Sequence, residues 1–191
     1  MSTLELAQRA LRAAEGDEAL ALVQSERSGM ARFARSEVHQ PTLIENDVVE
    51  LQVVRDGRLG IASGNSTDDE GMRTLAARAG EAADSAPADP DFPGLAAPAD
   101  PAAVEGYDEE AASLGAEDQA RLAAAAIDAS ELDLYGFFTS GVTSLALVTS
   151  SGVALSQDLT DVAVLALAAV DGVSGYAEET GWHAADVDPG R

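Results

Sequence analysis

The stretch that decides the fold is RFARSEVHQPTLIENDVVELQVVRDGRLGIASGNS, residues 32–66. Apolar and polar residues alternate in its second half, so Val49, Leu51 and Val53 share one face of a predicted strand. Asp56-Gly57 is a typical type I′ hairpin turn, because both central residues of that turn need a positive φ. The stretch therefore predicts an antiparallel β-ribbon rather than a catalytic loop.

The same patterns predict eight strands in two groups of four, separated by short turns such as Ser28-Gly29 and Ser140-Gly141. The expected strands are Glu18–Arg27, Met30–His39, Leu43–Arg55 and Arg58–Ser63, followed by Tyr135–Ser140, Thr143–Thr149, Val153–Gln157 and Asp161–Val170.

Helices are predicted before the first group and between the two groups. Ser2 with Glu5, and Thr67 with Glu70, have the spacing of capping boxes, and helical apolar periodicity follows each pair. The second of these helices is expected to continue to about Ala83. A third, alanine-rich helix is predicted over residues 116–130.

This order predicts an α+β fold, with an antiparallel sheet and helices packed on one side. The pattern of helix, four strands and helix, then linker, helix and four strands, also suggests an internal duplication. We expect a first part over residues 1–84, a proline-rich acidic linker over 85–115, a second part of the same domain over 116–170, and a connector toward a further domain over 171–191.

The amino-acid composition argues against several classes of function. The 191 residues carry a formal charge of −23, and all 11 basic residues are arginine. This balance opposes binding to nucleic-acid phosphates or to an anionic membrane surface. The chain has no cysteine, which excludes disulfides and thiolate chemistry. No stretch approaches the length of a membrane span, and the N-terminus does not resemble a signal peptide, so a cytoplasmic location is expected.

Residues for catalysis or metal binding are scarce. Without lysine the chain cannot form a P-loop or a Schiff base. The only histidines are His39 and His183, which is too few for a typical zinc site in a chain without cysteine. We therefore assign no catalytic residue and no metal ligand, and expect no cofactor in this chain.

Three polar residues of the 32–66 stretch are candidates for contact with a ligand or a partner subunit. Arg35 lies in the predicted second strand, where a guanidinium could bind a carboxylate of a peptide. His39 and Gln40 follow at the expected end of that strand. The alternative is that all three are ordinary polar residues on a strand surface.

The sequence resembles the N-terminal half of the TldD/PmbA family, the "modulator of DNA gyrase" proteins. The resemblance covers nearly the whole chain and is closer to the PmbA/TldE branch than to the TldD branch. It is carried by the order and spacing of Arg32–Gln40, Val53–Ser63, the Asp68–Ala83 helix, Tyr107-Asp108 and Ser174–Tyr176.

This resemblance implies a zinc metallopeptidase system that acts on unfolded or modified peptides. It implies a TldD-like subunit whose H-E-x-x-x-H helix holds the zinc, paired with a PmbA/TldE-like subunit that lacks this motif. The metal region lies beyond the part of the family that this chain matches. The expected role is therefore to shape the peptide cavity and the subunit interface of a proteolytic heterodimer.

Three other functions stay open. The chain could be a purely structural assembly module, in a pair with a TldD-like subunit or as a homo-oligomer. It could be a stand-alone hydrolase with an unrecognised site of carboxylates and metal. The name "modulator of DNA gyrase" would suggest a role linked to DNA. Because the chain has a formal charge of −23, we do not expect it to bind DNA directly.

Overall fold

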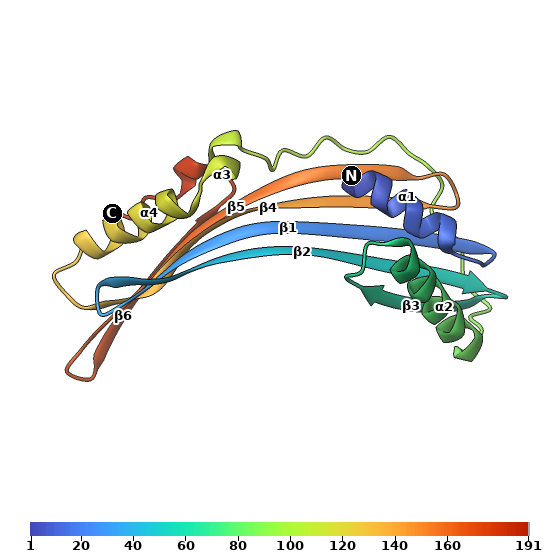
Figure 1. The fold of residues 1–191 in the computed structure, drawn as a ribbon, viewed down its shortest axis with the longest axis horizontal. Helices are drawn as coiled ribbons and strands as arrows, with labels where there is room; N and C mark the ends of the chain where they lie inside the picture. Colours follow the sequence, from blue (N-terminus) through green and yellow to red (C-terminus); the bar gives the residue numbers. More distant parts are fainter. Residues whose placement is uncertain (191) are drawn as a thin grey trace. The chain divides into compact units, whose positions relative to one another are not determined.

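A six-stranded sheet runs through the protein in the computed structural model, which describes residues 1–190. Its strand order is β3-β2-β1-β4-β5-β6, that of two three-stranded meanders joined along β1 and β4 (Figure 1). The elements are α1 (Thr3–Ala13), β1 (Glu18–Ala34), β2 (Glu37–Arg55), β3 (Arg58–Gly64), α2 (Asp69–Ser85), α3 (Glu109–Ser113), α4 (Ala116–Asp128), β4 (Leu134–Thr149), β5 (Ala154–Val170), β6 (Val173–Gly181) and the 3₁₀ turn η1 (Ala184–Asp186).

The junction between the meanders is antiparallel. The Ser150 N–H, just after β4, donates to Ala19 O at the start of β1 over 2.8 Å. At the other end, the Ser36 N–H, just after β1, donates to Leu134 O at the start of β4 over 3.0 Å. The start of each strand thus lies beside the end of the other. The predicted class, α+β with an antiparallel sheet, is confirmed.

The chain divides into two compact units, and each has its own core. The first unit comprises residues 1–25, 46–104 and 144–157. Helices α1 and α2 pack against one face of its strands, and the core consists mainly of alanine, valine and leucine side chains. Its buried members are Leu6, Ala7, Ala10, Ala21, Val23, Val49, Leu51, Val53, Ala62, Met72, Leu75, Ala76, Ala79, Ala146 and Val148.

The second unit comprises residues 26–45, 105–143 and 158–191. Here α3 and α4 cover one face of the strands, and two phenylalanines lie at the centre of the core. The buried members are Ala31, Phe33, Ala111, Ala123, Ala126, Leu134, Phe138, Val162, Val164 and Val187.

Helix boundaries follow largely from local sequence. The Ser2–Glu5 capping box is confirmed, with Glu5 N–H donating to Ser2 Oγ over 3.2 Å. The cap predicted at Thr67 is wrong by one residue, because Asp68 accepts from Gly71 N–H over 2.7 Å and begins α2. The short helix α3 lies inside the range predicted as linker.

The prediction of four strands in each group is wrong, because each group has three longer strands. β1 runs straight through Ser28-Gly29, and the turn that ends it is Arg35-Ser36, whose φ angles are 51° and 57°. β4 runs through Ser140-Gly141 and β5 through Leu159-Thr160. The predicted Asp56-Gly57 turn is confirmed, with φ angles of 49° and 69°.

The range predicted as a connector, residues 171–191, is also more regular than expected. It contains β6, which pairs with β5 from Val162↔Gly181 to Val170↔Val173. The structure thus adds to the sheet a strand for which the sequence shows no clear alternation.

Gly60 lets α2 lie directly against β3. A Cβ atom at this position would lie 2.1 Å from Ala79 O and 2.2 Å from Ala83 N, both backbone atoms of the helix. Backbone atoms cannot rotate aside as a side-chain tip can, so any larger residue must displace the helix.

We expect Gly60→Ala to lower the free energy of unfolding by about 1–3 kcal/mol or more, as overpacking of a well-packed core does. Gly175→Ala is the matched control, since a Cβ there meets nothing within 4 Å. Urea unfolding of both variants and of the wild type measures the difference. Equal losses in the two variants would show that the helix does not depend on this contact.

Candidate functional site

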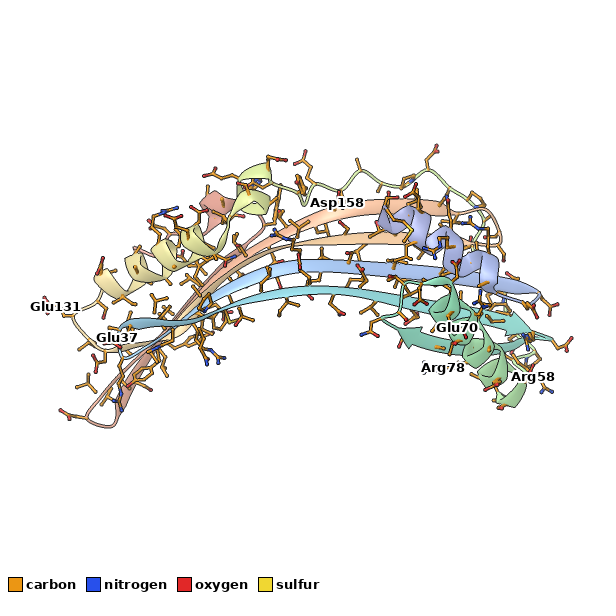
Figure 2. All side chains as sticks on the ribbon, viewed as in Figure 1. Glu37, Arg58, Glu70, Arg78, Glu131 and Asp158 are labelled. Carbon is orange, nitrogen blue, oxygen red and sulfur yellow. The ribbon has the colours of Figure 1, made fainter. Side chains whose placement is uncertain are left out.

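The outer side of β2 is a free sheet edge over its first half. β3 pairs with β2 only from Val49 to Arg55. Among residues 1–190, no strand pairs with the outer side of residues 37–48. Glu37, labelled in Figure 2, marks the start of this edge. Every residue from Glu37 to Asn46 is exposed, including Leu43 at 59%. An edge of this length can pair with an added strand.

A β-bulge interrupts this edge near Gln40. In an unbroken antiparallel pair of strands, the residue numbers of every two facing residues have the same sum. The two-residue turn places Ala34 opposite Glu37, and the sum of these residue numbers is odd. Farther along, Arg27 Nε lies 3.2 Å from Glu45 Oε1, and the sum of these residue numbers is even. β2 therefore contains one extra residue between these two points. Gln40, with a φ of 40°, lies in that interval.

The three predicted contact residues lie at the beginning of this edge. Arg35 is in the β1–β2 turn and not within a strand, so its predicted position is corrected. His39 is inside β2, not at its end, and Gln40 is at the bulge. All three are exposed, and their side chains make no hydrogen bond or ion pair within residues 1–190. Their role in binding stays a prediction.

A cleft of about 200 Å³ lies beside the same edge, within the second unit. Strand β2 supplies residues 41–43 to its wall, and the opposite wall comes from residues 111–119 of α3, α4 and the segment between them. Residues 27–29 of β1 and 140–141 of β4 complete the lining. The cleft therefore joins the free edge to the face of the sheet that the helices cover.

A buried polar pair lines the cleft. Gln119 of α4 is 4% exposed, and its Nε2 donates to Ser140 Oγ over 2.9 Å. Gly29 gives the amide room, because a Cβ at that position would lie 2.4 Å from Gln119 Nε2. Gly141 instead lets β4 lie close to β1, since a Cβ there would lie 2.7 Å from Ser28 Cβ. Small strand residues thus accommodate close neighbours in the lining of the cleft.

Charge is confined to the rim of the cleft. Arg27 is the only titratable residue in the lining, and its ion pair with Glu45 is about two-thirds exposed on both sides. An exposed pair of this kind contributes little to stability. The interior presents alanine, leucine, proline, serine, threonine and glutamine groups, so the cleft suits an uncharged occupant.

No motif in the sequence points to Gln119 and Ser140 as a pair. One signal was available in Ser28-Gly29, because a glycine inside a strand pattern often marks a close approach by another group. The turn predicted at Ser28-Gly29 is absent, because β1 continues through both residues. Thr139 Oγ1 donates to Gly29 O over 2.9 Å, which shows that this glycine is held within the sheet.

His183, the second histidine, belongs to a structural contact near the C-terminus. Its ring stacks on that of Trp182 with the centroids 3.5 Å apart, and its Nδ1 lies 3.9 Å from Asp108 Oδ1. Asp108 also accepts from Ala184 N–H over 2.8 Å and from Ala111 N–H over 3.2 Å. It therefore caps α3 and fixes the start of η1.

The donor groups that a zinc ion needs are not grouped in this part of the protein. Within residues 1–190, no three His, Cys, Asp or Glu side chains lie close enough together to hold a metal ion. The described residues therefore do not fit the zinc that the family resemblance implies. In the same range, no helix is long and apolar enough to cross a membrane.

A protein family matches part of the chain. Residues 19–83 match the family model described as PmbA/TldA metallopeptidase domain 1. The matched segment contains β1, the free edge of β2, β3 and most of α2. No curated protein sequence matches the chain.

Solved structures share the fold at low sequence identity. TldE from Thermococcus kodakarensis is 14% identical with a TM-score of 0.75, over 93% of this chain and 42% of that one. A candidate modulator of DNA gyrase from Thermotoga maritima is 16% identical with a TM-score of 0.78, over 97% and 45%. Another from Bacteroides thetaiotaomicron is 19% identical with a TM-score of 0.80, over 96% and 46%. The chain spans less than half the length of each of them.

The contacts of Asp108 predict a pH-dependent stability. The hydrogen bond from Ala184 N–H, followed by that from Ala111 N–H, holds the pKa of this carboxyl below its ordinary value. A lowered pKa in the folded state means that the carboxylate stabilises the protein above its unfolded pKa, and that this contribution is lost as the pH falls through the folded value.

We expect Asp108→Ala to lower the thermal midpoint at pH 7, because two N–H groups lose their acceptor. The difference from the wild type should shrink as the pH is lowered through the acid range. Asp100→Ala, an exposed change in the linker, is the control. Thermal unfolding followed by circular dichroism from pH 7 to pH 3 measures both. A difference that stays constant with pH would contradict the assignment.

Proposed function

We propose that the chain is the N-terminal domain of a TldD/PmbA-type protein, and that it shapes the peptide-binding cavity and the subunit interface of a proteolytic assembly. The observation that carries the proposal is the unpaired edge of β2 over residues 37–48. A sheet edge binds an extended peptide through its main chain, and neighbouring side chains add selectivity.

The position of the polar residues supports peptide contact. Arg35, His39 and Gln40 are exposed at the start of the edge and have no partner among residues 1–190. A guanidinium can bind a peptide carboxylate with two parallel hydrogen bonds. Pro41 has no N–H group, so a bound peptide would use the main-chain groups on either side of it.

The chemistry of peptide hydrolysis is assigned to a partner. The described residues of this chain group no metal ligands, so we propose that a TldD-like subunit supplies the zinc. A homo-oligomer, in which a further part of the polypeptide supplies the metal, is the alternative. In either arrangement the edge of β2 would hold the peptide and another segment would cleave it.

We expect Arg35→Ala/His39→Ala to weaken peptide binding by roughly 10- to 150-fold, because the loss of one charge-assisted hydrogen bond costs roughly 1.5–3 kcal/mol. The double variant is assembled with a TldD-like partner, and peptide affinity, peptide turnover and pair formation are measured together. Arg12→Ala, an exposed arginine on α1, is the control. Unchanged binding, turnover and assembly in the double variant would contradict a role for these residues.

An exposed apolar hairpin favours a second candidate function, that of a purely structural assembly module. At the tip of the β5–β6 hairpin, Val173 is 74% exposed and Tyr176 is 61% exposed. Residues 162–177 contain a single charged residue, Asp171, in a chain with a net charge of −23. Exposed apolar surface of this kind often marks a protein interface.

Val173→Asp/Tyr176→Ser tests the second function. If the hairpin forms the interface, the variant should lose association with a TldD-like partner or with itself in size-exclusion chromatography. A purely structural module would also fail to bind peptide, both as the wild-type chain and as the variant. Val104→Asp is the control, because Val104 in the linker is 65% exposed. Retained association of the variant would show that the hairpin does not lie in the subunit interface.

A further inference from the structure

We propose that the cleft beside β2 is a specificity pocket, which receives one uncharged, mainly apolar side chain of a peptide paired with the edge. This inference rests on the proposed function, because it requires a peptide on that edge. It adds a ligand class and a set of residues that select it, namely Leu43, Ala112, Ala116, Gln119 and Ser140.

The location of the cleft is the first argument. Residues 41–43 belong both to the edge strand and to the cleft wall. A strand added outside β2 would lie about 4.8 Å from it, and every second side chain would point to the face of the sheet that α3 and α4 cover. One such side chain can then pass over residues 41–43 and enter the cleft.

The volume is the second argument. A cavity of about 150 Å³ lined by apolar side chains can hold a benzene molecule. The cleft measures about 200 Å³. It therefore has room for a side chain of the size of leucine or phenylalanine, and a glycine or alanine would leave it largely unfilled.

The lining chemistry is the third argument. The groups inside the cleft carry no charge, and Arg27 at the rim is already paired with Glu45. A carboxylate or an ammonium group that entered would lose hydration without gaining an opposite charge, which is costly. Gln119 Nε2 donates one hydrogen bond to Ser140 Oγ within the protein, so this bond is kept when an apolar side chain fills the cleft.

Peptide binding to the full chain tests the inference. The probes are fluorescein-labelled seven-residue peptides of alanine and serine with one variable central residue, either Leu, Phe, Gly, Asp or Lys. Fluorescence anisotropy should give at least tenfold tighter binding for the Leu and Phe peptides than for the Asp and Lys peptides, with Gly between them.

Two variants should alter this preference. Ala116→Leu fills the cleft from its exposed wall and should abolish the advantage of the Leu and Phe peptides. Gly29→Ala should reduce it, because the new Cβ pushes the flexible Gln119 amide away from the sheet. Ala129→Leu, an exposed change just after the same helix, is the matched control and should keep the wild-type preference.

The outcomes separate this inference from the proposed function. Binding with no preference at the central residue, or a preference that Ala116→Leu and Gly29→Ala leave intact, would overturn the pocket and leave the edge as a general peptide site. Failure of every peptide to bind the wild-type chain would overturn both. Loss of the preference in the two cleft variants, with the preference kept in Ala129→Leu, would support the pocket.

Discussion

Close contact between helices and strands is the constraint on which the rest of the structure depends. The core of the first unit has no aromatic side chain and is rich in alanine and valine. Side chains of this size cannot fill a wide gap between the helices and the strands. The strands instead carry glycine where a helix comes near. Gly60 meets the backbone of α2, and Gly29 meets the Gln119 side chain of α4. Small residues here set the distance between layers and the orientation of each helix.

The same constraint acts in the lining of the cleft beside β2. Gln119 can lie flat on the strands only because Gly29 has no side chain, and its hydrogen bond to Ser140 then holds the start of α4 over β1 and β4. Residues 41–43 of β2 and residues of α4 line the cleft between the helix and the edge strand.

Features that depend on neighbouring residues could be predicted from the sequence, and those that depend on distant ones could not. The Ser2 cap and the Asp56-Gly57 turn need only local chemistry, and both are present. The turn at Arg35-Ser36 could not be predicted, because neither residue is typical of a turn with positive φ. The role of Gly29 could not be predicted, because it depends on contact with Gln119, which follows 90 positions later in the sequence. Only the folded chain brings the two residues together. The cleft could not be predicted for the same reason, because four segments that are far apart in the sequence line it.

The two proposed roles use opposite edges of one sheet. β2 is exposed beyond the reach of β3, and β6 is the outermost strand on the other side. A peptide paired with β2 and a subunit docked on the β5–β6 hairpin would therefore occupy different strands and need not compete. The distribution of charge follows the same division. The β2 edge mixes apolar residues with carboxylates and a histidine, as suits a ligand with polar main-chain groups. The hairpin from 162 to 177 is almost uncharged, as suits a surface that becomes buried.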